Sequence, residues 1–457
     1  MTIEQIYTSC LAQATYYIES EGEVAIIDPL RDYQNYIEKA KSNNANIKYI
    51  FETHFHADFV SGHIDLAKET GAEIVYGPNA KTGYKVCVAK DEQVFKLGKI
   101  SIQVIHTPGH TLESSCFLLT DENGKAHAVF TGDTLFVGDV GRPDLLDGII
   151  TKEELASMLF DSLKKLSVLP DEVIVYPAHG AGSACGKNIG KETFSTIGTQ
   201  KANNYALKIK DKNEFVSTVC SGISPAPAYF FKDASLNKNG YSDYNAIVKN
   251  GLQALSLEHF QNEITNGAVT IDSRIPDFFE LGFIPGSINL GLNGQFAIWA
   301  ATILDIHHAI VLVCKPGTEE ETITRLSRVG FDNIKGFLDG GFDTWLNADK
   351  KYDMVISISS EEFALDAKHN PNAMIIDVRK PSEFKDGHVK KAKNIPLDQL
   401  LNHVEDLDKN AECLIHCAGG YRSMMAASLF KKHGFKNIKN VWGGYAQIKE
   451  EEKIEIE

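Results

Sequence analysis

The sequence predicts an α/β protein of three domains. Its 457 residues are enough to build three separate cores. In the first half, strand-like apolar runs end in loops that carry histidine or aspartate, as at a sheet edge that binds a metal. In the second half, short apolar runs alternate with helical stretches, and the pattern occurs twice. This alternation implies parallel sheets covered by helices.

Four separated motifs supply candidate metal ligands. In chain order they are Thr53-His54-Phe55-His56-Ala57-Asp58, Thr107-Pro108-Gly109-His110-Thr111, Thr131-Gly132-Asp133-Thr134 and Tyr176-Pro177-Ala178-His179-Gly180. The last three follow strand-like runs at residues 100–105, 127–130 and 173–175. We therefore expect these side chains to converge on one edge of a sheet sandwich.

Phe59 directly follows the first motif, at a position where a two-metal hydrolase would carry another histidine. A phenyl ring cannot donate a lone pair, so a second metal would lose a ligand. The motif therefore favours a single metal with open coordination positions.

The order and spacing of the four motifs resemble the metallo-β-lactamase superfamily. Gly141-Arg142-Pro143-Asp144 is similar to its glyoxalase II and persulfide dioxygenase branch. The resemblance implies an αββα sandwich over residues 1–245. It also implies that the metal ligands are His54, His110 and Asp133. Three further residues become outer groups or remnants of a second metal site: His56, Asp58 and His179.

Two imidazoles and one carboxylate would leave positions for dioxygen and a substrate sulfur, as in non-haem Fe(II) oxygenases. The resemblance thus implies one Fe(II) per chain. Zinc is the alternative, since affinity alone does not select iron. Arg142 is a candidate for orienting the substrate or an outer carboxylate, or for a structural salt bridge. Cys185 is a candidate sulfur-carrying thiol near the metal, or an inert packed thiol.

An internal repeat defines two further modules. Ile271-Asp272-Ser273-Arg274-Ile275-Pro276 is matched by Ile376-Asp377-Val378-Arg379-Lys380-Pro381, at an offset of 105 residues (271 to 376). At the same offset, Phe279, Gly282 and Asn289 match Phe384, Gly387 and Asn394. The sequence therefore predicts homologous α/β modules at residues 253–349 and 355–457.

The loop Cys417-Ala418-Gly419-Gly420-Tyr421-Arg422-Ser423 follows a buried-type run, and a helix is expected to open at Ser423. Its glycines let successive backbone N–H groups face one point, which favours a thiolate and can hold a persulfide or sulfite oxygens. Arg422 adds a positive fork for an oxyanion.

This loop, together with residues 377–396, resembles the rhodanese sulfurtransferase family. The resemblance implies two parallel-sheet α/β domains, with Cys417 and Arg422 as catalytic residues. It also implies substrate contacts from Gly419, Gly420 and Tyr421.

The first copy departs from this pattern. Its stretch Val313-Cys314-Lys315-Pro316-Gly317-Thr318-Glu319-Glu320-Glu321 lacks the arginine and places three glutamates where an anion would dock. Pro316 also removes one N–H, and Phe283 replaces the position of His388. We interpret this copy as a non-catalytic spacer; the alternative is that Cys314 still carries sulfur.

The composition of the chain limits which binding partners and which cellular location we expect. The net charge of −15 argues against a nucleic-acid partner. No apolar run approaches the ~20 residues of a membrane span, and the first residues do not resemble a signal peptide. Eight cysteines without CxxC pairs fit reduced thiols. We therefore expect a cytoplasmic protein without a membrane partner; a homo-oligomer is compatible with the sequence.

Together the two resemblances imply oxidation of a low-molecular-weight thiol persulfide by dioxygen to sulfite, followed by sulfur transfer through Cys417 to give thiosulfate. The carrier thiol stays open among glutathione, coenzyme A, cysteine and others. Two alternatives remain: a glyoxalase II-type zinc thioester hydrolase fused to a sulfurtransferase, and a delivery scaffold in which only Cys417 moves sulfur. The stretch Asn237-Lys238-Asn239-Gly240 is expected to be a connecting loop.

Overall fold

The computed structural model describes residues 1–146 and 148–457. The chain divides into two compact units. The first contains Met1–Tyr244 with the short segment Ser327–Gly330, and the second contains Asn245–Leu326 with Phe331–Glu457. Each unit is described separately below.

Two six-stranded sheets build the first unit. The first sheet, antiparallel from β1 to β3 and parallel from β3 to β6, has the order β1 (Thr2–Thr8), β2 (Gln13–Ser20), β3 (Glu23–Ile27), β4 (Asn46–Glu52), β5 (Glu73–Tyr76), β6 (Cys87–Val88). The second has the order β12 (Ser195–Thr196), β11 (Ile174–Pro177), β10 (Ala126–Gly132), β9 (Ser115–Thr120), β8 (Ile100–His106), β7 (Val94–Leu97). Its strands are antiparallel except for the parallel pair β10 and β11.

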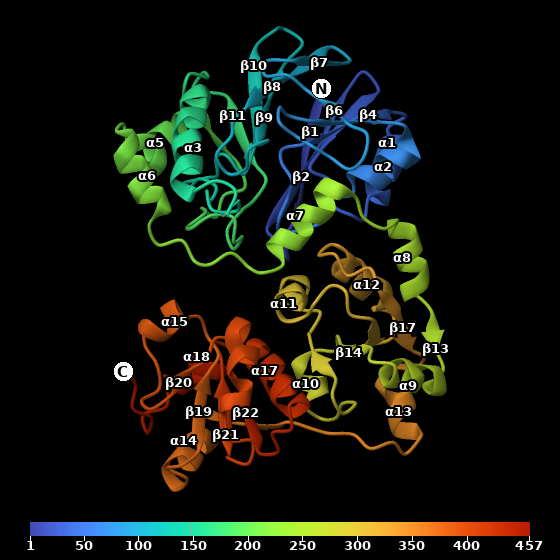
Figure 1. Cartoon of the computed structure of the whole chain (residues 1–457), viewed down its shortest axis with the longest axis vertical. Coiled ribbons are helices and arrows are strands. Elements are labelled where there is room, and N and C mark those ends of the chain that lie inside the picture. Colours follow the sequence, from blue (N-terminus) through green and yellow to red (C-terminus); the bar gives the residue numbers. More distant parts are fainter. Residues whose placement is uncertain (147) are drawn as a thin grey trace. The chain divides into compact units, whose positions relative to one another are not determined.

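Helices cover the outer faces of both sheets, so the unit is an αββα sandwich. Figure 1 shows α1 and α2 beside the first sheet, and α3 and α6 beside the second. The helices of this unit are α1 (Gln34–Ser42), α2 (His63–Thr70), α3 (Lys152–Ser167), α4 (Ile197–Asn203), α5 (Tyr205–Lys208), α6 (Lys212–Cys220) and α7 (Phe230–Asn239). The predicted sandwich is thereby confirmed.

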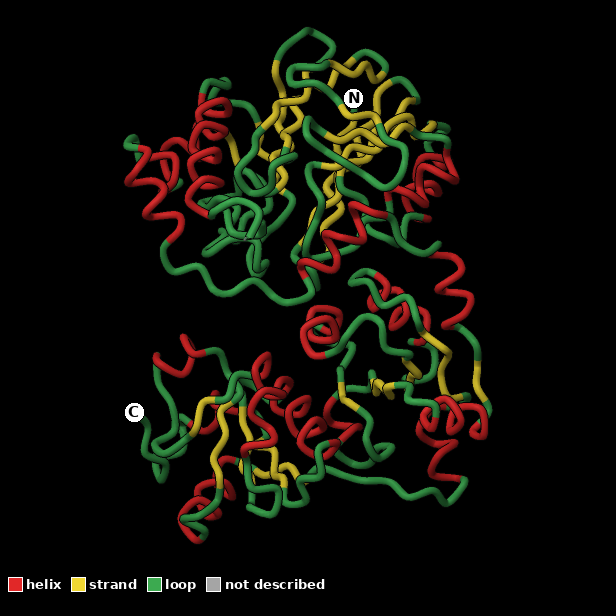
Figure 2. The backbone as a smooth tube through the Cα atoms, viewed as in Figure 1, coloured by secondary structure: helices red, strands yellow, loops and turns green. Residues whose placement is uncertain are grey.

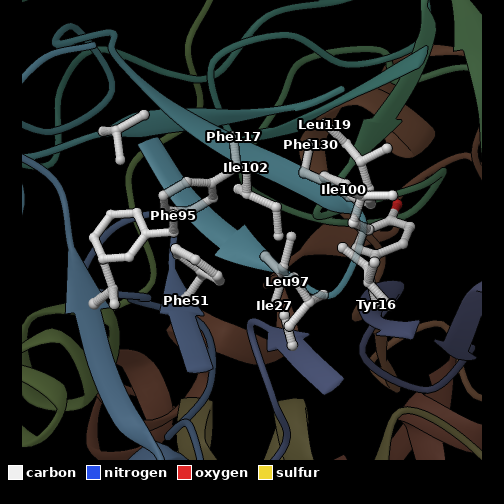
Figure 3. Packing of buried hydrophobic residues seen from close by; sticks show 14 of the residues in the cluster. Tyr16, Ile27, Phe51, Phe95, Leu97, Ile100, Ile102, Phe117, Leu119 and Phe130 are labelled. Carbon is white, nitrogen blue, oxygen red and sulfur yellow. The ribbon is translucent and has the colours of Figure 1, made fainter. Parts of the chain in front are cut away.

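Aromatic and aliphatic side chains from both sheets fill the space between them (Figure 3). Phe51 from β4 lies 5.4 Å from Phe95 of β7 and 4.8 Å from Phe117 of β9, measured between ring centroids. Each fully buried phenyl ring contributes roughly 1.5–3 kcal/mol relative to an exposed one. This packing fixes the two sheets against each other, and with them the loops at their strand ends.

The second unit contains two five-stranded, fully parallel sheets. They have the orders β13 (Ala254–Leu255), β17 (Ile334–Leu338), β16 (Ile310–Val313), β14 (Val269–Asp272), β15 (Ile288–Asn289), and β18 (Ile356–Ile358), β22 (Ile438–Val441), β21 (Cys413–His416), β19 (Met374–Asp377), β20 (Lys393–Asn394). Figure 2 shows the two sheets as separate groups of strands flanked by helices. The two predicted parallel-sheet modules are confirmed.

Helices surround both sheets. Those of the first copy are α9 (Leu257–Thr265), α10 (Pro276–Phe279), α11 (Phe296–Ile303), α12 (Glu319–Ser327) and α13 (Gly341–Asn347); α8 (Tyr244–Gly251) precedes them. Those of the second copy are α14 (Ser360–His369), α15 (Pro381–Lys385), α16 (Leu400–His403), α17 (Tyr421–Lys432) and α18 (Gly444–Ile448), with 3-10 turns at Leu397–Gln399 and Val404–Asp406.

The repeated residues of the two copies make the same internal contacts. Arg274 pairs with Asp272 and donates to Gly282 O at 2.9 Å, and Arg379 pairs with Asp377 and donates to Gly387 O at 2.8 Å. The repeated residues therefore stabilise the turn that follows β14 in the first copy and β19 in the second. Because both copies have these contacts, the contacts do not indicate which copy is catalytic.

Two local expectations are corrected. Helix α17 begins at Tyr421 rather than Ser423, because the chain already turns into the helix after Gly420. The expected connecting loop at residues 237–240 is instead the last turn of α7, which ends at Asn239 with Gly240 as its C-cap. Within the described part of the chain, no helix combines the length and apolarity that a membrane crossing requires.

Candidate metal centre and sulfur-transfer loop

Three loops bring His54, His110 and Asp133 together. They follow β4, β8 and β10, so both sheets contribute. Asp133 Oδ2 lies 3.8 Å from His54 Nε2 and 3.4 Å from His110 Nε2. All three atoms are buried and have no hydrogen-bond partner within the described residues. Three unpartnered buried donor atoms that face one another form a set that a divalent cation would satisfy.

The second nitrogen of each ring sets its tautomer. His110 Nδ1 lies 2.8 Å from the carbonyl of Arg142, which can only accept, so Nδ1 carries the proton. His54 Nδ1 lies 2.9 Å from Thr53 Oγ1, and that hydroxyl donates its own hydrogen to Asp28. His54 Nδ1 is therefore also the donor. Both Nε2 atoms keep a free lone pair directed into the site, as metal binding requires.

Burial favours the neutral rings. It lowers the pKa of His54 well below the usual value, with a further contribution from neighbouring His56, and it lowers the pKa of His110. Burial alone would raise the pKa of Asp133, but the adjacent His179 outweighs it and the pKa is lowered. Neutral imidazoles and an ionised carboxylate are the protonation states that bind a metal.

His179 holds Asp133 from the other side. His179 Nδ1 is 2.8 Å from Asp133 Oδ1, and its Nε2 forms an ion pair with Asp58 Oδ2, also at 2.8 Å. Asp58, His179 and Cys185 form a second group of potential ligands. In this structure, however, His179 bridges two carboxylates, so it orients Asp133 rather than completing the first group.

His56 pairs with other carboxylates than Asp133, although its ring lies 4.2 Å from that of His54 between centroids. Its Nε2 lies 3.0 Å from Asp28 Oδ1 and 3.7 Å from Glu52 Oε2, all three residues being buried. Burial, with a contribution from Asp28, raises the pKa of Glu52 well above its usual value. The ring of Phe59 covers His56 at 4.3 Å between centroids. His56 therefore belongs to a separate buried cluster with the carboxylates of Asp28 and Glu52.

Two residues that no sequence pattern singled out hold the motif loop, residues 53–61, in place. Asn237 Nδ2 donates to the carbonyls of His56 and Phe59, each at 2.7 Å, and its Oδ1 accepts from the N–H of Ser61 at 2.9 Å. Glu113 accepts from the N–H of Phe55 at 3.0 Å. Only the folded chain brings α7 against a loop that lies about 180 residues earlier.

Arg142 is a structural residue in this geometry. Its guanidinium forms a bidentate pair with Asp144 at 2.7 and 2.8 Å and donates to the carbonyls of Ala184 and Ser224. These contacts favour the salt-bridge interpretation. The preceding Gly141 packs so closely that an added Cβ would lie 1.9 Å from Asp133 O, so a side chain there would displace the metal loop.

Cys185 is a member of the second group of potential ligands. Arg142 N donates to its carbonyl at 2.9 Å. Burial, followed by the nearby charges of Asp58 and Asp133, raises the pKa of its thiol well above the usual value. The site thus favours the neutral thiol at this position.

Cys417 of the second copy directly follows β21, and the loop that it begins leads into α17 at Tyr421. The thiol is 1% exposed, and Gly420 N donates to its sulfur at 3.1 Å. The sequence predicts backbone N–H groups directed at this sulfur, and this contact is one of them. An added Cβ at Gly419 would meet no atom within 4 Å, so the space beside the loop is open.

Arg422 is already paired. Its two Nη atoms lie 2.7 and 2.8 Å from the carboxylate oxygens of Glu383, and this hydrogen-bonded partner lowers the pKa of Glu383. The predicted anion fork therefore shares its charge with a carboxylate. Arg422 could therefore offer a bound anion only the N–H groups that Glu383 leaves free, and only from this fixed orientation.

In the first copy the equivalent loop is filled by its own residues. Cys314 is 2% exposed, and burial raises the pKa of its thiol to about 11. Glu319 accepts from the N–H of Gly317 at 2.8 Å, so a carboxylate occupies the backbone donor that an anion would use. This arrangement supports the non-catalytic interpretation of the copy.

A pocket of about 570 Å³ adjoins Cys417. The loop residues Gly419 and Tyr421 line it, and so do Gln295 and Trp299 of the first copy. No pattern in the sequence around Gln295 or Trp299 predicts a role for either residue. Comparison of the two repeats shows which copy lacks the residues of the sulfur-transfer loop. It does not show which surface of that copy contacts the other copy.

Similar proteins match the two halves separately. Residues 8–179 match the metallo-beta-lactamase superfamily, and residues 256–348 and 360–451 match the rhodanese-like domain. A probable hydroxyacylglutathione hydrolase of Schizosaccharomyces pombe is 33% identical over 204 residues, which cover 44% of this chain and 73% of that protein. A solved metallo-beta-lactamase from Staphylococcus aureus subsp. aureus COL is 32% identical, covers 74% of this chain and 98% of its own, and has a TM-score of 0.66.

A solved structure of ETHE1 from Myxococcus xanthus is 29% identical over 52% of this chain and 98% of its own, with a TM-score of 0.45. The chain belongs to the metallo-beta-lactamase superfamily. More specifically, it is a metallo-beta-lactamase domain followed by two rhodanese-like domains.

Proposed function

We propose that this protein is a persulfide dioxygenase fused to a sulfurtransferase. The observation that carries the proposal is the separate convergence of two neutral imidazoles and one carboxylate, His54, His110 and Asp133, while His56 faces Asp28. This set supports one metal with open positions, the arrangement typical of non-haem Fe(II) oxygenases. Phe59 supports it further, because its ring replaces a ligand that a second metal would need.

His54, His110 and Asp133 would hold one Fe(II) per chain. When bound, Fe(II) supplies an open coordination site and the one-electron chemistry that dioxygen requires. The protein contributes the fixed tautomers of both histidines and the orientation of Asp133 by His179. The buried position of all three side chains limits access of water to the site.

The overall oxidation balances without a further reductant. A thiol persulfide, dioxygen and water give the thiol, sulfite and two protons: RSSH + O2 + H2O → RSH + SO3²⁻ + 2H⁺. The outer sulfur is oxidised and dioxygen is reduced, and the S–S bond breaks to leave the carrier thiol. The substrates are therefore a low-molecular-weight thiol persulfide and dioxygen.

Cys417 would act on the same sulfur pool. Its thiolate attacks the outer sulfur of a second persulfide, the S–S bond of that donor breaks, and the donor leaves as a thiol. Sulfite then attacks the outer sulfur held on Cys417, which forms the S–S bond of thiosulfate and returns the thiolate. Gly420 N stabilises the sulfur as an anion. We place this chemistry in the cytoplasm, with no nucleic-acid or membrane partner.

Metal analysis combined with oxygen uptake tests the proposal. We expect about one iron per chain and oxygen consumption that depends on glutathione persulfide, with thiosulfate as the product. Cys417→Ser should consume oxygen equally well but accumulate sulfite, whereas Cys314→Ser should behave as wild type. Oxygen consumption that does not depend on the persulfide would contradict the proposal. So would thiosulfate production by Cys417→Ser at the wild-type rate, after subtraction of a control without enzyme.

A second candidate function is supported by the relative from Schizosaccharomyces pombe, whose name describes a probable hydroxyacylglutathione hydrolase. A glyoxalase II-type zinc hydrolase would use the same fold. It is disfavoured by Phe59 and by the position of His56. Zinc in the purified protein together with cleavage of S-lactoylglutathione would establish it in place of the oxygenase.

A further inference from the structure

The pocket at Cys417 is built by both rhodanese-like copies. Tyr421 and Lys380 of the second copy line it together with Gln295 and Trp299 of the first copy. Gln295 precedes α11 and Trp299 lies within it. The copy without sulfur chemistry of its own therefore contributes side chains to the site of the copy that has it.

Close contacts fix these two copies at the pocket. The hydroxyl of Tyr421 donates to the carbonyl of Gly291 at 2.6 Å. A Cβ added at Gly294 would lie 2.5 Å from the Tyr421 ring, so only glycine lets the backbone pass there. Nearby, the N–H of Asn289 donates to Ser428 Oγ of α17 at 3.0 Å. The segment that leads into α11 is thus seated on the helix that carries Tyr421.

Arg325 of the first copy also stabilises the segment that leads into α11. Its guanidinium donates to the carbonyls of Leu292 and Gly294, the latter at 2.8 Å, and lies 5.6 Å from the ring of Phe296. Arg325 is 8% exposed and belongs to α12, the helix that follows the altered Cys314 loop. This helix holds a wall of the Cys417 pocket in place.

The size and chemistry of the pocket indicate its occupant. A water molecule takes about 30 Å³, so an anion of four heavy atoms such as sulfite would fill on the order of 100 Å³. A volume of about 570 Å³ lies within the ~300–1,000 Å³ that hold organic ligands. The lining includes the aromatic side chains of Trp299 and Tyr421, the amide of Gln295 and the ammonium of Lys380, which is the positive charge for a carboxylate. Glu383 also lines the pocket, but its carboxylate is paired with Arg422.

We propose that Trp299 and Gln295 of the first copy bind the organic part of the sulfur donor and so determine specificity at Cys417. The donor class that fits is a thiol persulfide whose body carries amide and carboxylate groups. This inference rests on the proposed sulfur transfer at Cys417. It gives the first copy a positioning role in place of that of a spacer: Trp299 packs on the donor, Gln295 hydrogen-bonds to it, and the outer sulfur is presented to the thiolate.

The test compares two donors with one acceptor in the full-length protein, without oxygen so that persulfide is not oxidised. Cyanide is the acceptor, and glutathione persulfide or thiosulfate is the donor. For Trp299→Ala we expect the ratio of kcat/KM for glutathione persulfide to kcat/KM for thiosulfate to fall about tenfold, through KM. Tenfold corresponds to about 1.4 kcal/mol, which is within the cost of truncating a packed aromatic contact. Trp299→Phe should restore most of that ratio.

Gln295→Ala is the second variant; its side chain is exposed, so folding is not at risk. We expect the same ratio to fall severalfold. Phe278→Ala, an aromatic side chain of the same copy that is 53% exposed and does not line the pocket, is the matched control and should leave both donors unchanged. A ratio within twofold of wild type in both Trp299→Ala and Gln295→Ala, or equal losses for both donors, overturns the inference.

The same experiment separates this inference from the proposed function. If the wild-type protein shows no transfer from either donor that Cys417→Ser abolishes, then the proposed sulfurtransferase activity itself fails. If the wild type transfers sulfur and the donor ratio does not respond to the variants, only the role of the first copy fails.

Discussion

His56 Nε2 lies 3.0 Å from Asp28 Oδ1, although His56 is only two residues from His54, whose Nε2 faces Asp133. The two histidines of one short motif thus serve different clusters. His54 belongs to a set of three unpartnered ligand atoms, and His56 to a buried group with Asp28 and Glu52. This divergence separates His56 from the group of His54, His110 and Asp133, and it defines which substitutions should remove a metal bound by that group.

Replacing His110 with alanine should reduce the metal content of the protein from about one per chain to near zero. The remaining two ligands, His54 and Asp133, cannot hold the ion at ordinary concentrations. Elemental analysis of the purified variant checks this. His127→Ala at the opposite end of β10 is the control and should keep the metal. Sulfur transfer through Cys417 should persist in His110→Ala, and its loss would show that the variant is not folded.

Replacing Phe59 with histidine should raise the metal content towards two per chain. The new imidazole would enter a buried position directly after Asp58, which lies with His179 and Cys185 in one group of potential ligands. Phe55→His is the matched control, because Phe55 lies in the same motif but packs against Tyr76 at 4.9 Å between ring centroids. A wild-type protein that already binds two metals at full occupancy would refute the single-metal argument.

Replacing Asn237 with alanine should weaken metal binding without touching a ligand. The variant loses three hydrogen bonds to the motif loop, so we expect roughly 10–100-fold lower metal affinity. The first unit should also lose about 1–3 kcal/mol of stability. Competition with a chelator measures the affinity. Asn239→Ala in the same helix, whose side chain bonds only to exposed Ser235 in the structure, should leave it unchanged.

The stability of the second unit should fall as pH is lowered from 7.5 to 5. Burial lowers the pKa of His416 to about 4, whereas an unfolded histidine titrates near 6.5. Between these values the unfolded chain binds more protons, so protonation favours unfolding, by on the order of 2 kcal/mol at pH 5. His416→Leu should reduce this dependence on pH.

Urea unfolding followed by tryptophan fluorescence reports on the second unit alone, since Trp299, Trp345 and Trp442 all lie within it. His369→Gln, at an exposed histidine of α14, is the control. An equal pH dependence in wild type and His416→Leu would contradict a buried neutral ring at this position.

The sequence alone determined the class of fold and the identity of the candidate ligands. Hydrophobic runs followed by histidine or aspartate located β8, β10 and β11 to within one or two residues, because strand periodicity and strand ends are local properties. The repeat of Asp272 and Arg274 in Asp377 and Arg379 identified two modules. The role of each candidate ligand stays a prediction until metal is measured.

Only the tertiary structure decided how these residues are oriented and supported. No local pattern separates His54 from His56, since the direction of each ring depends on Asp133 and Asp28, which come from other strands. Asn237 reaches the motif loop because α7 packs there, and Trp299 reaches the Cys417 pocket because one copy packs on the other. Such contacts depend on the packing of segments that are far apart in the chain, so the spacing of residues in the sequence does not predict them.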